Sequence, residues 1–337
     1  MYEIRLCKFD EIDLLINFLK NSWSQNHIFL KNKDILNFQH KSLDEYNFIV
    51  AYHIETKCFH GVLGIISPDF YIDRKINKNQ DLWLAIWKVE KSISKSGSLG
   101  MDMLYYLETE FEPKSISAIG VNETVTLLYK AIGFKTKKMK QWFIPNRNFV
   151  DHKLITGDLP ASVNLGSDPS YKIIECKAEQ ENIIDFFLSS IKSKKSFRYL
   201  LERYLNHPIY KYKIYAFLKS ELEIHALVVG RKVMAKGVSA FRITDFFVEH
   251  EVLLNLSYSF EEILKKGAYE YIDFLEYGFD ELSLKNCGFI KCVDSLYVPN
   301  LFEPFVAGHM EVKIAYRSKL PFSCTKGDSD LDRPNQN

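Results

Sequence analysis

The stretch from Leu82 to Phe134 constrains the fold of this chain most strongly. It begins with an almost unbroken apolar run, Leu82 to Val89, which is too short for a typical helix and is bounded by Asp81 and Glu90. Such a run predicts a strand that is covered on both faces. A turn rich in glycine and serine follows at 95–100, and then a segment whose apolar residues recur at helical spacing.

A second apolar run, Ile116 to Val121, completes a strand–helix–strand unit with parallel strands and a right-handed crossover. Asn122 can cap the helix that follows, and Gly133 stands where that helix should end. The turn before the first helix offers backbone N–H groups at a helix N-terminus, so it suits a pyrophosphate. Small residues before a helix are common in ordinary turns, so this turn alone is weak evidence for a ligand.

A longer pattern follows the second strand, N-x-x-V-x-x-L-Y-x-x-x-G-F, and it is carried by Asn122, Val125, Leu128, Tyr129, Gly133 and Phe134. In this segment the chain resembles the GNAT superfamily of acyl-CoA-dependent N-acyltransferases. The two signatures of that superfamily are R/Q-x-x-G-x-G/A and N-x-x-A-x-x-L-Y-x-x-x-G-F. The first signature is matched more loosely than the second: Lys95 replaces Arg or Gln, Ser98 replaces the first Gly, and Gly100 is retained.

The resemblance implies an α/β (α+β) fold with a mixed twisted sheet and flanking helices. It implies a coenzyme A thioester, acetyl-CoA or a 3-hydroxyacyl-CoA, as co-substrate. It also implies Tyr129 as the acid that protonates the departing thiolate, and a backbone N–H near Trp87 as the oxyanion donor. The coenzyme-binding residues that it implies are Trp87, Lys88, Val89, Lys95, Ser96, Gly97, Ser98, Leu99, Gly100, Met101 and Asn122.

The polar stretch 21–47 lies over the acceptor side of the cleft in GNAT enzymes, so by resemblance Trp23 and Asn26 are expected to bind the substrate. His27 is a candidate weak base, and a surface or helix-end histidine is the more ordinary interpretation. A base need not be a side chain, because the amine of an amino sugar is less basic than lysine and a water chain could serve.

A chain of 337 residues predicts two domains. Tyr171–Lys177 echoes Tyr2–Lys8, and Glu276–Phe289 aligns without a gap on Val121–Phe134, which predicts an internal repeat. We expect a GNAT domain with the acyl-CoA site at 1–150, a linker at 151–170, a degenerate GNAT-like domain at 171–318 and a disordered tail at 325–337.

The second copy differs from the first at the predicted site. Leu284 takes the place of Tyr129, and the segment 249–254 has no glycine and two carboxylates, which would repel a pyrophosphate. We therefore expect one acyl-CoA per chain and a second domain that binds the acceptor or supports the first. Arg242 and Asp245 are candidate substrate ligands there; a buried ion pair is an equally good interpretation.

The formal net charge of +1 gives no general attraction to nucleic acid or to an anionic membrane. The six cysteines form no C-x-x-C pair, which favours reduced thiols in the cytoplasm and no metal. The sequence shows neither an apolar signal core nor a run of membrane-spanning length.

Within the superfamily the resemblance is closest to tandem-GNAT sugar N-acyltransferases of bacterial O-antigen and capsule pathways. It implies transfer of an acetyl or hydroxyacyl group to the amino group of a dTDP- or UDP-linked amino-deoxy sugar, and a homodimer is the habit of the class. The segments that carry it include W-x-x-x-H from Trp23, LWLAIWKV, LGMDMLYYLE, RYLNHPIY, FRITDFF, YIDFLEYG and PNLFEP. Two alternatives stay open: a tandem-GNAT aminoacyl or peptidyl transferase, and a non-catalytic binding protein for acyl-CoA or sugar nucleotides in which Tyr129 is a core residue.

Overall fold

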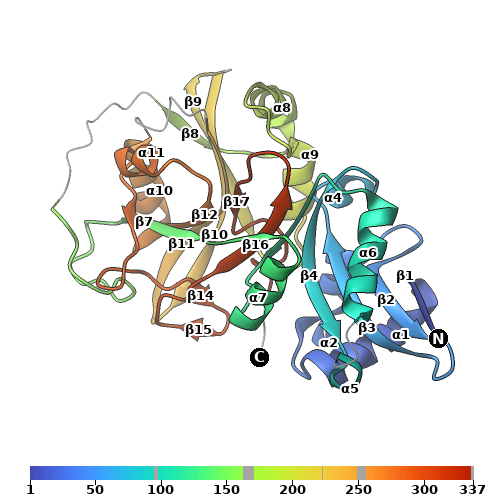
Figure 1. Ribbon diagram of the computed structural model, residues 1–337. Helices are drawn as coiled ribbons and strands as arrows, with labels where there is room; N and C mark the ends of the chain where they lie inside the picture. Colours follow the sequence, from blue (N-terminus) through green and yellow to red (C-terminus); the bar gives the residue numbers. More distant parts are fainter. Residues whose placement is uncertain (95–97, 162–170, 222, 249–255, 335–337) are drawn as a thin grey trace. The chain divides into compact units, whose positions relative to one another are not determined.

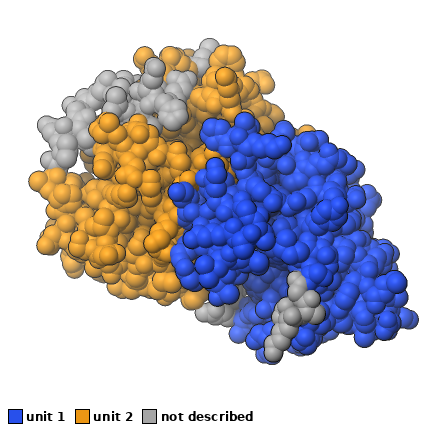
Figure 2. Space-filling model, viewed as in Figure 1, with its two compact units in different colours: residues 1–137, 313–321, 329–337 blue, residues 138–312, 322–328 orange. Residues whose placement is uncertain are grey.

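The computed structural model describes residues 1–94, 98–161, 171–221, 223–248 and 256–334. The chain forms two compact units, which Figures 1 and 2 show as a ribbon and as a space-filling view. Unit 1 contains residues 1–137, 313–321 and 329–337, and unit 2 contains residues 138–312 and 322–328. The chain therefore passes from one unit to the other four times.

Unit 1 is built on a seven-stranded sheet. In sheet order the strands are β1 (Tyr2–Lys8), β2 (Glu45–His53), β3 (Cys58–Ile66), β4 (Asp81–Val89), β5 (Ser115–Ile119), β16 (Lys313–Ser318) and β6 (Lys135–Lys138). The pair β4–β5 is parallel, and the pairs β1–β2, β2–β3, β3–β4 and β5–β16 are antiparallel.

Two helices cover one face of this sheet: α6 (Leu99–Phe111) and α7 (Glu123–Ala131). The buried residues of α6 recur every three or four positions, so they form one apolar stripe that packs on β2 to β5. The remaining helices are η1 (Phe9–Glu11), α1 (Ile12–Phe18), η2 (Leu19–Trp23), α2 (Ile28–Lys31), α3 (Lys33–His40), α4 (Phe70–Asp73) and α5 (Lys91–Ser94).

Unit 2 is built on a second sheet, whose strands in order are β8 (Lys172–Glu175), β9 (Tyr212–Ser220), β10 (Glu223–Ala235), β11 (Val238–Val248), β12 (Tyr271–Tyr277), β7 (Lys140–Pro145) and β13 (Ile290–Lys291). A short strand, β17 (Cys324–Thr325), also pairs with β12, and β14 (Leu301–Phe302) pairs with β15 (Phe305–Val306). The helices are η3 (Ala178–Gln180), α8 (Glu181–Ser190), α9 (Phe197–Leu200), η4 (Leu201–Leu205), α10 (Ser257–Gly267) and α11 (Glu281–Asn286).

The two sheets repeat one strand order. Read from β8, the second sheet matches the first strand by strand, with β11 in the place of β4, β12 in that of β5 and β7 in that of β16. The strand β7 comes directly after β6 in the sequence but joins the second sheet. The strand β16 comes after β8 to β15 in the sequence but joins the first sheet. Each unit thus contains one strand from the other half of the sequence.

Because β7 and β16 are exchanged between the sheets, the boundaries of the two units differ from the domain boundaries expected from the sequence. Residues 138–150 were expected in the first domain, but β7 belongs to unit 2, where Trp142 and Phe143 are fully buried. The expected tail is also partly ordered, because Thr325 lies in β17 and is buried. In the expected linker, the N–H of Leu154 donates to Glu270, and residues 162–170 lie outside the described residues.

Candidate functional site

The parallel strands β4 and β5 part in the middle of the unit 1 sheet. They pair only from Asp81 to Trp83 of β4, opposite Ser115 to Ser117 of β5. The register between β3 and β4 then shifts, so that Ala85 is an extra residue that bends β4. The carboxyl-terminal half of β4 therefore pairs with β3 alone and has an open edge where β5 would otherwise lie.

A cavity of about 380 Å³ lies at this carboxyl-terminal half of β4. It is lined by Trp87, Lys88, Val89, Lys91, Ile93, Leu99, Gly100, Met101, Val125 and Leu128. Its walls thus come from the end of β4, from α5, from the start of α6 and from α7, which lie close together in Figure 1. The volume falls in the range of small-molecule sites.

Six of the predicted coenzyme residues line this cavity: Trp87, Lys88, Val89, Leu99, Gly100 and Met101. Four further residues line the cavity that were not among the predicted coenzyme residues: Lys91, Ile93, Val125 and Leu128. The spacing of Val125 and Leu128 on one turn of the predicted α7 helix could have indicated them. Lys95, Ser96 and Gly97 lie outside the described residues.

The cavity combines positive charge with apolar surface. Lys88 and Lys91 contribute ammonium groups, and the first turn of α6 adds backbone N–H groups at the positive end of its dipole. A Cβ at Gly100 would lie 3.5 Å from Nε1 of Trp87, so the helix start approaches the strand closely. Ser98 Oγ donates to Asp102. This arrangement can hold a phosphate group beside an apolar chain.

Tyr129 does not line the cavity, but its ring packs against Trp87, which does. Its ring centroid is 5.6 Å from that of Trp87, which lines the cavity, and 4.9 Å from that of Phe134. Only 2% of Tyr129 is exposed, and burial raises the pKa of its hydroxyl well above the usual value. The hydroxyl has no hydrogen-bond partner among the described residues. It therefore keeps its proton at neutral pH, as a proton donor must.

Asn122 caps α7 and does not line the cavity. Its Oδ1 accepts from the N–H of Val125 at 2.9 Å. Asn122 thus fixes the start of the helix that carries Tyr129, which is a structural role.

The structure argues against His27 as a base. Only 6% of His27 is exposed, and its Nδ1 accepts from the N–H of Phe29 at 3.3 Å, as the N-cap of α2. Burial, and then the charge of Arg333, lowers the pKa of His27 to about 3. The ring is therefore neutral at pH 7 with its hydrogen on Nε2, so this nitrogen can donate a hydrogen bond but cannot accept a proton.

The other two predicted acceptor residues of unit 1 lie on the surface. Trp23 is 44% exposed at the end of η2, and Asn26 is exposed in the loop that follows. Neither residue lines the cavity described above.

Arg242 and Asp245 are both buried, but they do not pair with each other. Arg242 donates to Asp273 at 2.8 Å and to the carbonyl of Pro299 at 3.2 Å. Asp245 accepts from Lys195 at 2.7 Å. The prediction that Arg242 and Asp245 bind substrate is therefore not supported, since both are engaged in ion pairs of the unit 2 core.

In unit 2 the strands β11 and β12 also separate, and the gap between them is filled by the short strand β17. β11 and β12 pair only at Phe241–Ile243, and β17 then pairs with Glu276 and Tyr277 of β12. Because β7 takes the other edge of β12 at Glu276, β17 must lie on the side of β11. The N–H of Gly327 also donates to the carbonyl of Thr244 in β11. The segment 249–254, from which the sequence predicted the loss of a second coenzyme site, lies outside the described residues.

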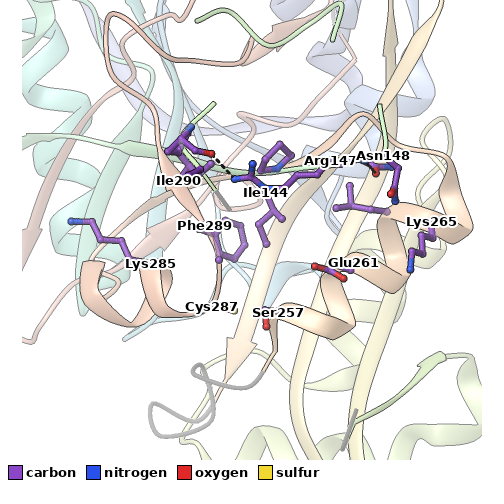
Figure 3. A pocket seen from close by; sticks show the side chains of 16 residues that line it. Ile144, Arg147, Asn148, Ser257, Glu261, Lys265, Lys285, Cys287, Phe289 and Ile290 are labelled. Carbon is purple, nitrogen blue, oxygen red and sulfur yellow. Dashed lines mark hydrogen bonds between the residues drawn. The ribbon is translucent and has the colours of Figure 1, made fainter. Parts of the chain in front are cut away.

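Unit 2 has a different cavity, of about 440 Å³, between α10 and the turn from α11 to β13 (Figure 3). Lys265, Lys285 and Glu261 lie around it, and Arg147 donates to the carbonyl of Pro160 at 3.0 Å. The equivalent place in unit 1 is taken by Arg317, which lies over the ring of Phe134 and pairs with Glu108. Ile144 and Pro145 of β7 line the cavity in unit 2.

Within the described residues, no group of three or more His, Cys, Asp or Glu side chains could hold a metal ion. No described helix is both long and apolar enough to cross a membrane. All six cysteines are described, and none forms a disulfide.

The buried His27 predicts a loss of stability in acid. Between pH 6.5 and about 3 the unfolded chain binds a proton at His27 that the folded chain does not, so the free energy of unfolding falls as pH falls through this window. His27→Asn keeps an N-cap residue but removes the proton. Denaturation at pH 7 and pH 5 should show that the variant loses about 2 kcal/mol less than the wild type between these values. Equal losses would contradict the buried, neutral state of His27.

No protein-family model matches this chain, and the search of curated proteins found no similar sequence. Solved structures do match it. A GCN5-related N-acetyltransferase from Anabaena variabilis aligns with a TM-score of 0.58 and 11% identity, over 94% of this chain and 72% of that one. A probable N-acyltransferase from Enterococcus faecalis aligns with a TM-score of 0.55 and 11% identity, over 94% and 73%.

A third similar structure is a GCN5-related glucosamine N-acetyltransferase region of a fungal multi-domain β-N-acetylglucosaminidase. Its TM-score is 0.53 at 10% identity, over 94% of this chain and 38% of that one. At these identities the comparisons establish the fold. The predicted fold class is confirmed, and the chain has the fold of the GCN5-related N-acetyltransferases.

Proposed function

We propose that this chain is an acyl-CoA-dependent N-acyltransferase that acylates the amino group of a nucleotide-linked amino-deoxy sugar. One observation carries the proposal. The cavity at the open edge of β4 brings together six residues that the GNAT resemblance assigns to the coenzyme, and Tyr129 lies one ring away. The fold shared with GCN5-related N-acetyltransferases supports the same reaction class.

The residues of the cavity fit an acyl-CoA substrate. Lys88, Lys91 and the start of α6 would hold the diphosphate, and Trp87, Val89 and Leu128 would pack against the pantetheine arm. The bend at Ala85 leaves backbone groups of β4 unpaired toward β5, where the thioester oxygen can accept a hydrogen bond.

The proposed reaction is the aminolysis of a thioester. The neutral amine attacks the carbonyl carbon, a C–N bond forms, and the C–S bond breaks. Tyr129 donates its proton to the departing thiolate, the amine nitrogen releases one proton to solvent, and solvent returns one proton to Tyr129, so that the products are the amide and the free thiol. The raised pKa of Tyr129, caused by burial, keeps the hydroxyl protonated before the reaction.

Two considerations favour an amino sugar as the acceptor. One similar structure is named as a glucosamine N-acetyltransferase region. In addition, His27 is unsuitable as a base, and an amino sugar needs a base less than lysine does because its amine has a lower pKa. With either dTDP or UDP as the nucleotide, the product would serve O-antigen or capsule synthesis in the cytoplasm.

The alternative of a non-catalytic binding protein has one observation in its favour. Tyr129 is 2% exposed and belongs to the apolar core between the sheet and α6 and α7, as a purely structural tyrosine would. Catalysis and binding must therefore be measured separately.

A larger side chain at Leu128 should block the coenzyme. Leu128 lines the cavity and is 44% exposed, whereas its neighbour Leu127 is 62% exposed and does not line it. Leu128→Trp should raise the Kd for acetyl-CoA ~10-fold or more, which corresponds to about 1.4 kcal/mol, and Leu127→Trp should leave it unchanged. Calorimetric titration of the two variants checks this. Equal affinities would place the coenzyme elsewhere.

Removing the Tyr129 hydroxyl should separate catalysis from binding. Tyr129→Phe keeps the ring that packs on Trp87, so the Kd for acetyl-CoA should not change, while kcat should fall ~100-fold because the thiolate loses its proton donor. The assay measures free thiol released from acetyl-CoA in the presence of UDP- or dTDP-linked amino sugars. Tyr105→Phe, on the exposed side of α6, is the matched control. An unchanged kcat in Tyr129→Phe would make Tyr129 a core residue.

A further inference from the structure

The last described part of the chain is divided between the two units. Residues 322–328 belong to unit 2, and the residues that follow belong to unit 1. We call Phe322–Asp328 the anchor and Ser329–Pro334 the terminal segment. The anchor contains β17 and occupies the gap between β11 and β12.

A buried charge network holds the anchor. Nζ of Lys195 lies 2.7 Å from Asp245 and 2.9 Å from Asp328. Oγ1 of Thr325 donates to Asp245 at 2.7 Å. Because a buried carboxylate that loses its cation is strongly destabilising, these contacts favour a single position of the anchor.

At Gly327 the backbone of the anchor lies close to Tyr204 and Thr244. A Cβ there would lie 2.2 Å from the hydroxyl of Tyr204 and 2.8 Å from the carbonyl oxygen of Thr244. No side chain fits at this position without displacing the anchor.

The terminal segment runs past the carboxyl end of β5 in unit 1. A Cβ at Gly120, the residue directly after β5, would lie 3.8 Å from Leu331. Ser329, Asp332 and Pro334 are buried. The carboxyl ends of the parallel strands β4 and β5 lie at the same edge of the sheet, so the segment passes the edge at which these strands part.

Arg333 lies on the sheet face opposite the coenzyme cavity. Its guanidinium carbon is 5.6 Å from the centre of the Phe29 ring, and Phe29 packs on Phe48 with ring centroids 6.4 Å apart. Ile49, next to Phe48 in β2, faces the core under α6 and α7. Since neighbouring residues of a strand point to opposite faces, Phe48 and Arg333 lie on the other face. Asp330 pairs with Arg333.

Two histidines pack against the Phe29 ring over which this cation lies. The Phe29 ring lies 4.6 Å from His27 and 5.4 Å from His40. The Nε2 of His27, both Nε2 and Oε1 of Gln39, and Nδ2 of Asn47 are buried and have no hydrogen-bond partner among the described residues. Buried polar groups are normally satisfied by protein, water or ligand. A cation beside neutral N–H donors suits an anionic oxygen-rich group.

We propose that Arg333 is a specificity-determining residue that binds a phosphate of the acyl acceptor. This inference rests on the proposed function. In the proposed function the coenzyme occupies the cavity on the α6 and α7 side of the parting strands, which leaves the opposite face, where Arg333 lies, for the acceptor.

The decisive experiment compares Arg333→Gln, Arg333→Lys and the matched control Arg198→Gln, which changes an exposed arginine of α9. Arg333→Gln should raise the KM for a UDP- or dTDP-linked amino sugar ~10-fold or more, with the KM for acetyl-CoA unchanged. Arg333→Lys should rescue part of the loss. With glucosamine, which has no phosphate, Arg333→Gln and wild type should react equally.

A binding measurement keeps this inference separate from the proposed function. UDP and inorganic pyrophosphate are titrated into wild type and Arg333→Gln by calorimetry. The Kd should rise ~10-fold or more in the variant, even if no amino sugar is turned over. An active wild type with an unchanged acceptor KM in Arg333→Gln would overturn the role of Arg333 alone. A wild type that binds neither probe would also overturn it.

A second variant tests the anchor. Gly327→Ala should displace the anchor and raise the acceptor KM as Arg333→Gln does, while the Kd for acetyl-CoA stays that of wild type. Gly308→Ala is the matched control, because a Cβ there meets no atom within 4 Å. An acceptor KM that stays normal in a folded Gly327→Ala variant would show that the anchor does not position Arg333.

Discussion

The short parallel pairing of β4 with β5 is the constraint on which the rest of this structure depends. Three residues of β4 pair with β5, and a bulge at Ala85 then turns the strand away. A central strand with one unpaired edge is costly in a protein interior, because its N–H and C=O groups must find partners. The two units meet this requirement differently: unit 1 leaves a cavity at the edge, and unit 2 fills the gap with the anchor.

The anchor explains why a buried charge network lies in the core of unit 2. Burial alone lowers the pKa of Lys195, but Asp245 and Asp328 outweigh burial and hold that pKa well above its usual value. Such groups stabilise little compared with an apolar core, but they specify one arrangement, because removing one partner leaves a buried charge. Here the specified arrangement is the insertion of β17 beside β12.

The sequence predicts the elements that line the unit 1 cavity better than it predicts the arrangement of unit 2. The apolar run of β4, the spacing of α6 and the cap at Asn122 are local signals, and each places its element correctly. The exchange of β7 and β16 has no local signal, because a short, mostly buried strand such as Lys140–Pro145 fits either sheet. The polar sequence after Thr325 resembles a disordered tail, and only the gap between β11 and β12 gives it a place. Arg242 and Asp245 also show this limit: their burial follows from the strand, but their partners lie far away in sequence.

The central claim is that one gap between parting strands is open for acyl-CoA and the other is closed by the chain itself. The number of acetyl-CoA molecules bound by this 337-residue chain can be measured by isothermal titration calorimetry. The account predicts one molecule of acetyl-CoA per chain. Two molecules per chain would show that the anchor does not close the second gap, and no binding would show that the first gap is not a coenzyme site.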